Sequence, residues 1–261
     1  VALIEVSGNR WLSQGVQTAD TAANPVNPRE RFDVSVKNNR DDADYSQNPP
    51  YIPEKDEQGR LRFEQSLVYR ITSLDSGHVI SARRSQRDGE RNFTGYRTLK
   101  LYVRNHGRPI RGSFLVRLIA NDSNSYYQYQ EPLTSYWRDV AIELDRFSDL
   151  KKLSRDPDGF LTRGNYSIKG NPNLTQVSRI ALGVMAEEDI GPEDGAEIWF
   201  DDLRLEDVRR DGGTALTSRL SLGLADVINL NLSYDHRGAH FYSINDRPPT
   251  MGNRSQSYSL G

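Results

Sequence analysis

An aromatic run near the middle of the chain carries side chains that could bind sugars. Tyr127 and Tyr129 lie in this run, and Trp137 follows a few residues later. Aromatic faces bury the C–H surface of a sugar ring well, and their edges form hydrogen bonds. These three residues are therefore the candidate carbohydrate-binding site. The alternative is that the aromatic side chains simply fit a pleated strand.

Two adjacent carboxylates, Asp201 and Asp202, are the candidate metal site. Ca²⁺ is a hard cation that takes several oxygen ligands, and Asp189, Glu193 and Asp194 could supply more of them. The alternative is that one of the two aspartates ties a neighbouring loop through hydrogen bonds to backbone N–H groups. We expect no cofactor beyond such a structural Ca²⁺.

No motif typical of a catalytic site occurs in the sequence. Glu143, Asp145 and Asp201 are the candidates for a glycosidase acid pair, but nothing in their spacing requires that role. His236 and His240 are four residues apart, but a glycine lies between them and the setting is a loop, which disfavours a helical zinc site. A phosphate loop, a nucleophile elbow, a zincin motif and cysteine are all absent from the sequence. We therefore expect no catalytic residues and a non-enzymatic protein.

Many short strand-like runs, separated by Gly, Pro, Asn and Asp, predict an all-β fold. The strongest runs are 99–103 and 113–119. In the run 137–144 the alternation predicts that Val140, Ile142 and Leu144 face the core. One short helix is expected at 145–153. Residues 61–210 are thus predicted to form a jelly-roll-like β-sandwich, of the kind seen in galactose-binding and carbohydrate-binding modules.

The remaining segments differ in composition from this central domain. Residues 1–36 are predicted to be N-terminal strands, which could be the end of a preceding barrel or repeat unit. Residues 37–60 are a long polar stretch, interpreted as an exposed insertion or loop. Residues 211–261 form an amphipathic tail. The chain starts at Val1 and stops within an alternating pattern, so we expect it to be part of a longer protein.

The tail alternates apolar and polar residues in two runs, each about as long as a tilted strand that crosses a bilayer. This pattern predicts the first strands of an outer-membrane β-barrel, with one face towards lipid and the other towards the lumen. The alternative is a soluble hairpin packed on the sandwich. The predicted membrane-facing residues are Leu216, Leu220, Leu222, Leu224, Ile228, Leu230, Leu232 and Tyr234.

Charge and hydropathy limit the other function classes. The net charge is −2, with 34 basic and 36 acidic residues intermixed, so no nucleic-acid partner is expected. No run of 18 apolar residues occurs, so no transmembrane helix is predicted. Barrel strands escape that test because half of their residues can be polar.

Several segments together resemble the SprA (Sov) family of very large outer-membrane proteins. The resemblance covers most of the chain from about Leu61 to Tyr234 and the opening 4–11. Its clearest part is 196–205 (Ala-Glu-Ile-Trp-Phe-Asp-Asp-Leu-Arg-Leu), although the family more often has Asn-Glu where this chain has Asp201-Asp202. The other similar segments are 97–100, 125–133, 168–174, 180–184, 212–215 and 224–227.

The resemblance implies a structural role in the outer-membrane translocon of the type IX secretion system, which exports folded proteins and supports gliding motility. The implied partners are outer-membrane lipid, other secretion-system subunits and secreted cargo. The implied location is the outer membrane or cell surface of a Bacteroidota-like bacterium. The alternative function is a carbohydrate-binding sandwich of a secreted or surface protein, with a glycan as its partner.

Overall fold

The computed structural model describes residues 11–18, 25–120, 122, 124–156, 159–209, 215–224, 228–237 and 253–260. Their contacts divide the chain into two compact units, Val1–Asp207 and Val208–Gly261. Each unit is described by itself.

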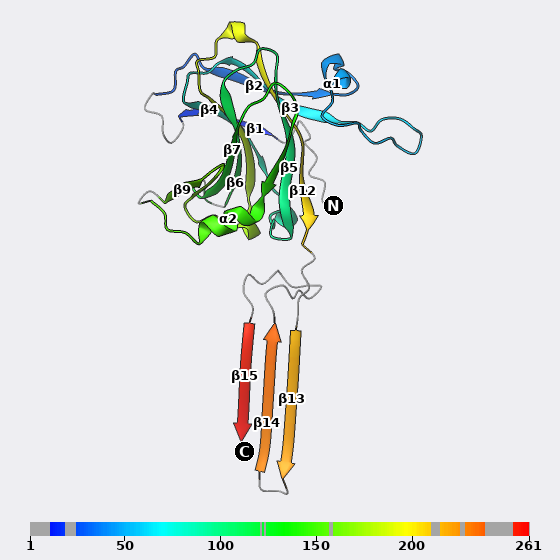
Figure 1. Cartoon of the computed structure of the whole chain (residues 1–261), viewed down its shortest axis with the longest axis vertical. Coiled ribbons are helices and arrows are strands. Elements are labelled where there is room, and N and C mark those ends of the chain that lie inside the picture. Colours follow the sequence, from blue (N-terminus) through cyan, green and yellow to red (C-terminus); the bar gives the residue numbers. More distant parts are fainter. Residues whose placement is uncertain are drawn as a thin grey trace. The chain divides into compact units, whose positions relative to one another are not determined.

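The first unit is built from two antiparallel sheets that face each other (Figure 1). The larger sheet has seven strands, in the order β1 (Leu12–Thr18), β4 (His78–Ser85), β11 (Arg179–Ala186), β6 (Gly112–Ile119), β7 (Tyr126–Pro132), β10 (Tyr166–Lys169) and β9 (Phe160–Arg163). The smaller sheet has five, in the order β2 (Arg31–Asn38), β3 (Gln65–Ser73), β12 (Ala196–Val208), β5 (Tyr96–His106) and β8 (Arg138–Glu143).

Helices are few and short in the described part of the chain. α2 (Leu144–Lys151) follows β8 and buries Phe147 and Leu150, and it confirms the short helix expected at 145–153, although Leu153 lies beyond its end and is exposed. The others are the single-turn α1 (Ala43–Gln47), η2 (Asp88–Glu90), η3 (Leu174–Gln176) and η4 (Pro192–Asp194).

The core lies between the two sheets and follows from the alternation along each strand. On β6, Phe114 and Val116 are buried in it, and on β8, Val140 and Ile142 face it from the other sheet. Leu144 joins them at the start of α2, as its place in the pattern predicted. These burials confirm the prediction of an all-β sandwich.

β12 changes the phase of its alternation within the strand. Ala196 and Phe200 face the core, and so do Leu203 and Leu205, although two residues lie between Phe200 and Leu203 where a regular strand would have one. Between them Asp202 has a left-handed backbone with φ of 48°. A residue in this conformation acts as an inserted bulge residue, which restores the inward direction of the strand's second half.

The N-terminal strands belong to this sandwich, contrary to the predicted boundary at residue 61. β1 pairs with β4, and β2 pairs with β3 along its whole length. The sequence could not show this because strand pairing joins segments that are distant along the chain. Within the predicted N-terminal strands, residues 1–10 and 19–24 lie outside the described residues.

The segment 39–64, which we call the covering segment, is more than an exposed insertion. Tyr45 in α1 is fully buried against the five-stranded sheet. The distal loop, closed by a bridge between Lys55 and Leu61, projects from the sandwich (Figure 1). One part of the polar stretch is therefore packed and the other is exposed.

The second unit holds one three-stranded antiparallel sheet, β13 (Ala215–Leu224), β14 (Ile228–Arg237) and β15 (Asn253–Leu260). Its register pairs Leu220 with Leu232, and the side chains of Leu216, Leu220 and Leu232 are 57%, 48% and 40% exposed. The other predicted membrane-facing residues are paired as Leu222 with Leu230, Leu224 with Ile228, and Ser218 with Tyr234. None of the helices in the described part of the chain has the length and apolar character needed to cross a membrane.

Candidate functional site

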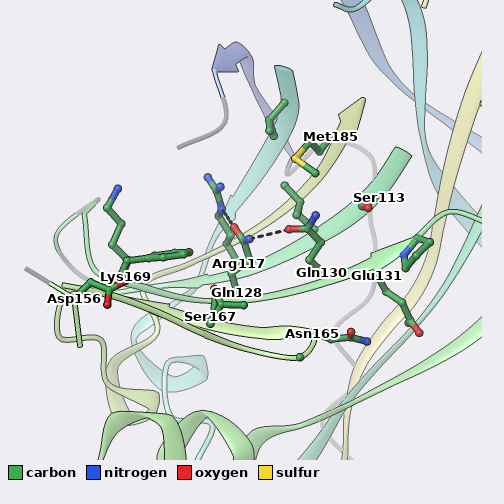
Figure 2. A pocket seen from close by; sticks show the side chains of 16 residues that line it. Ser113, Arg117, Gln128, Gln130, Glu131, Asp156, Asn165, Ser167, Lys169 and Met185 are labelled. Carbon is green, nitrogen blue, oxygen red and sulfur yellow. Dashed lines mark hydrogen bonds between the residues drawn. The ribbon is translucent and has the colours of Figure 1, made fainter. Parts of the chain in front are cut away.

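The outer face of the seven-stranded sheet carries an open groove of about 860 Å³. Its lining comes from β4, β6, β7, β9, β10 and β11 and from the loops next to β9 and β10 (Figure 2). This volume lies within the range of small-molecule sites in proteins, roughly 300 to 1,000 Å³. The groove is therefore the candidate functional site of the sandwich.

A row of polar side chains crosses the floor of this groove. Arg117 on β6 is the register partner of Gln128 on β7, which is opposite Ser167 on β10, which is opposite Thr162 on β9. Cross-strand partners face the same side of a sheet, so these four residues form one line, which we call the polar row. Gln130 lies beside it on β7.

Hydrogen bonds hold the polar row in place. Arg117 Nε donates to Gln128 Oε1 at 2.6 Å, and Gln128 Nε2 donates to Gln130 Oε1 at 3.3 Å (Figure 2). The hydroxyls of Thr162 and Ser167 lie 2.9 Å apart. The Arg117 guanidinium carbon also lies 4.8 Å from the centre of the Tyr126 ring, within the range of a cation–π contact. The row is thus organised without a ligand.

The strands expose polar residues here because the inward positions hold the core. On β7, Tyr127 and Tyr129 point inward, which leaves Gln128 and Gln130 on the outer face. At the centre of that face, Gly183 on β11 has no side chain, and a Cβ there would meet the Ile80 carbonyl oxygen at 3.0 Å. Gly183 lines a second, small hollow between β4 and β6, which shares Arg117 with the groove.

The predicted sugar-binding residues are not brought together at this groove. Tyr127 and Tyr129 are 2% and 6% exposed, and both belong to the core. The Tyr127 hydroxyl donates to the Pro172 carbonyl oxygen at 3.1 Å. Trp137 lies beside the other sheet, against Trp199. The groove is lined instead by the outer face of β7, which carries Gln128 and Gln130.

The outer face of the five-stranded sheet is occupied by the covering segment. Tyr45 packs on Trp199, and Trp137 Nε1 donates to the Asn48 carbonyl oxygen at 2.7 Å. The Lys37 ammonium lies 4.8 Å from the Trp199 ring centre, and the His106 ring stacks on that tryptophan at 4.2 Å. Tyr45, Trp199 and Trp137 thus form a second, small hydrophobic core on this face.

Asp201, predicted as a metal ligand, anchors the covering segment instead. Its Oδ2 accepts hydrogen bonds from the hydroxyls of Tyr45 and Ser66, both at 2.6 Å. Asp202 is ion-paired with Arg204. The alternative of a loop tie therefore describes Asp201 better, although the donors are side-chain hydroxyls and not backbone N–H groups.

The raised pKa of Asp201 and the ion pair of Asp202 also disfavour a cation. Burial raises the pKa of Asp201 to about 7, against the opposing effect of the bonds from Ser66 and Tyr45. Burial likewise raises the pKa of Asp202 to about 6, against the opposing charge of Arg204. A calcium site needs ionised carboxylates that are free to bind, whereas near neutral pH Asp201 is only partly ionised and Asp202 is held by Arg204.

Two of the additional candidate ligands, Asp189 and Asp194, have structural partners of their own. Asp189 Oδ1 accepts from the Ser76 backbone N–H at 2.7 Å. Asp194 Oδ2 accepts from the Gly191 N–H at 2.8 Å, and its Oδ1 pairs with Arg108. These carboxylates close loops.

One cluster within the described ranges has metal-ligand spacing, namely Glu30, Asp75 and His78. Glu30 Oε1 lies 2.7 Å from His78 Nδ1 and accepts from the Asp75 N–H at 2.8 Å. Its Oε2 accepts from the Asn27 N–H at 2.6 Å. Both carboxylate oxygens of Glu30 therefore already accept hydrogen bonds or contact His78. The cluster is a hydrogen-bond network that joins β4 to the segment before β2.

The residues considered as a glycosidase acid pair are far apart. Glu143 is the register partner of Thr98, whose hydroxyl donates to Asp207 at 2.8 Å. Asp201 lies six residues earlier on β12, which is roughly 20 Å along a strand. Acid pairs of glycosidases lie about 5 to 10 Å apart. Glu143 and its neighbour Asp145 therefore cannot pair with Asp201.

Comparisons with solved structures find only distant likeness. A family 11 carbohydrate-binding module from Clostridium thermocellum, solved with a β-1,3-1,4-mixed-linked tetrasaccharide, is 11% identical, with a TM-score of 0.42, over 76% of this chain and 89% of that one. An exo-β-agarase is 12% identical, with a TM-score of 0.40, over 78% of this chain and 25% of that one. No protein-family model and no curated protein matches the chain. These values establish no function.

Proposed function

We propose that the first unit is a carbohydrate-binding β-sandwich that holds a glycan in the groove of the seven-stranded sheet. The observation that carries this proposal is the polar row, Arg117–Gln128–Ser167–Thr162, on the floor of that groove. Amides and hydroxyls can both donate and accept hydrogen bonds, as sugar hydroxyls do. A preorganised line of such groups therefore suits a polyhydroxylated chain that lies across the strands.

The proposed function is binding without catalysis. Glu131, a carboxylate that lines the groove, is held by two partners. Arg138 pairs with its Oε1, and the Tyr129 hydroxyl donates to its Oε2 at 3.0 Å. A carboxylate fixed in this way suits a positioning role better than proton transfer, which requires a group free to exchange its proton.

The test is retention of the full chain on immobilised glycans, with Gln128→Ala as the principal variant. We expect the wild-type chain to be retarded by at least one plant or algal polysaccharide, and the variant to lose most of that retardation. Gln176→Ala, an exposed glutamine in η3, is the matched control and should behave as wild type. Equal retardation of all three proteins would contradict the groove as the binding site.

A second candidate function rests on the second unit. Leu216, Leu220 and Leu232 are exposed on one face of this sheet. On the other face, the Thr217 hydroxyl donates a hydrogen bond to Asp235. One apolar and one polar face is the pattern of a strand at a lipid boundary. With the SprA-like sequence segments, it supports a structural role in an outer-membrane protein-conducting translocon.

This second function is compatible with the first, because it concerns a different unit. Its test is flotation of the full chain with liposomes made of outer-membrane lipids. We expect the wild-type chain to float with the vesicles and the double variant Leu220→Asn, Leu232→Asn to remain below. A wild-type chain that stays monomeric in buffer and does not float would contradict the membrane role.

A further inference from the structure

A small hollow lies beside the groove, where β4, β11 and β6 run next to one another. Its volume is about 10 Å³, close to the least that holds one water molecule, so it takes one small group and no more. Three residues of the groove, Val79, Leu115 and Arg117, also line the hollow. A ligand that lies in the groove can therefore place one small substituent in the hollow.

The hollow exists because two outward-facing residues of β11 are small. Gly183 is the register partner of Ser81 on β4 and of Leu115 on β6. A Cβ at Gly183 would lie 3.0 Å from the Ile80 carbonyl oxygen and 3.6 Å from the Leu115 Cβ, so any side chain here would fill the space. Ala181, two positions earlier on the same face, is the other small residue of the wall.

The walls of the hollow are mainly apolar. In the described part of the chain they come from Val79, Leu115, Ala181 and Gly183, together with the polar residues Ser81 and Arg117. An enclosed water needs about two to four polar partners, and the paired strands already use their backbone groups within the sheet. A methyl group suits these walls better than water does, since it gives up no hydrogen bonds there.

Arg117 supplies hydrogen-bond donors next to the apolar walls. Its Nε–H is used on Gln128 at 2.6 Å, and its guanidinium group carries four further N–H donors. The Tyr126 ring, 4.8 Å from the guanidinium carbon, helps to fix the position of this group. Figure 2 shows Arg117 extending from the groove floor to the same side of the sheet as Met185. The hollow thus combines space for a methyl group with a donor for an adjacent oxygen.

We infer that the hollow receives the acetyl group of an acetylated glycan. This inference rests on the proposed glycan-binding function and adds the class of glycan. An acetyl group combines a methyl with a carbonyl oxygen that accepts hydrogen bonds. The methyl lies against Val79, Leu115 and Gly183, and the carbonyl oxygen accepts from Arg117. O-acetyl esters and N-acetyl amides of sugars share this chemistry.

The decisive experiment compares matched glycans with and without acetyl groups. The full chain is titrated with O-acetylated xylan and with the same xylan after mild alkaline deacetylation. In parallel it is titrated with chitohexaose and cellohexaose, which differ only in the acetamido group on each ring. We expect binding to the acetylated member of at least one pair to be tighter by about tenfold or more, since a buried methyl and a hydrogen bond to a charged donor both add affinity. The preferred pair distinguishes the ester from the amide.

Filling the hollow connects that preference to this site. Gly183→Ala and Ala181→Val add methyl groups from two positions on β11, and each should bring the affinity for the acetylated glycan to within about threefold of that for its partner. Gly89→Ala makes the same glycine substitution at an exposed position with open space and should keep the full preference. Melting temperatures verify that the variants are folded. Valine suits a strand, so Ala181→Val carries the test if Gly183→Ala does not fold.

Each other outcome has a distinct meaning. Equal or weaker affinity for the acetylated member of both pairs would overturn the acetyl inference while leaving the glycan-binding function standing. A preference that survives in both filled variants would overturn it as well, because the acetyl group would then be bound elsewhere. Failure to bind any of the four glycans would also overturn it, and the proposed function itself falls only if no polysaccharide retards the chain.

Discussion

The hydroxyl of Tyr69 donates a hydrogen bond to the carbonyl oxygen of Leu182 at 2.8 Å, from one sheet to the other. The same hydroxyl accepts from the Ala82 N–H, also at 2.8 Å. Ala82 and Leu182 are register partners on β4 and β11. A tyrosine of the five-stranded sheet is therefore bonded to both strands of a pair in the opposite sheet.

Replacing this tyrosine by phenylalanine tests the link between the sheets. Tyr69→Phe keeps the ring in the core but leaves the Ala82 N–H and the Leu182 carbonyl without the hydroxyl. Unsatisfied buried groups cost about 1 to 3 kcal/mol, so the free energy of unfolding should fall by that amount in a urea titration. Tyr136→Phe, at an exposed position, is the control and should change it by less than about 0.5 kcal/mol.

The stability of the sandwich should depend on pH through Asp201. Its pKa in the folded state, about 7, lies above the unfolded value, so the folded state holds the proton more tightly. The stabilisation is complete below about pH 4 and is lost as pH rises towards 7. The loss is at most on the order of 3 to 4 kcal/mol, measured by denaturation at each pH.

Asp201→Asn isolates this contribution. The amide oxygen can accept the hydrogen bonds of Tyr45 and Ser66, while the titrating proton is removed. The free energy of unfolding of the variant should decline less than that of the wild-type chain between pH 4 and 7. Parallel curves for the two proteins would show that Asp201 is not the titrating group.

Loosening the packing of the covering segment should leave the groove intact. Tyr45→Ala deletes a fully buried ring and should cost about 3 to 5 kcal/mol, as for other aromatic truncations in a core. We also expect faster proteolytic cleavage within 39–64, and unchanged glycan retention below the unfolding transition. Ile52→Ala, at a side chain 88% exposed in the same segment, should alter neither property.

Two glycines with similar backbones should differ in their tolerance of a methyl group. Gly164 and Gly170 have φ of 57° and 62°. A Cβ at Gly164 meets nothing within 4 Å, whereas one at Gly170 would clash with Ser125 Oγ. Both alanine variants pay about 1 to 2 kcal/mol for the left-handed conformation. Gly170→Ala should lose a further 1 to 3 kcal/mol, roughly, through the clash, measured by urea denaturation. Equal losses would show that Ser125 moves away freely.

The alternation of single strands predicted much of the fold. On β8 it correctly identified Val140 and Ile142 as core residues. Very short strands escaped it, because β9 and β10 have only four residues each and carry little periodic signal. β1 also carries little periodic signal, because its seven residues are mostly polar and include Gly15.

The site was harder to predict, because it depends on which face of a strand is inside. The aromatic residues Tyr127 and Tyr129 were assigned to binding, but in β7 they supply the core. The useful signal was the pair Gln128 and Gln130 at the intervening positions, where side chains that bond in both directions recur with the period of a strand. Assembling the polar row also required the register of four strands, which a single sequence does not contain.

The bulge at Asp202 divides β12 into two stretches, and the outward-facing residues of each stretch can be substituted independently of the other. Before Asp202 its outward side chains, such as Glu197 and Trp199, serve the covering segment, and after it they are Arg204 and Glu206. A related protein that lacked residues 39–64 would need substitutions only in the part of β12 before Asp202, where Trp199 would otherwise be exposed. Because Asp202 is the inserted residue, a strand without it would alternate regularly from Phe200 to Leu203 and keep Leu203 and Leu205 in the core, so this strand should tolerate the loss of that one codon.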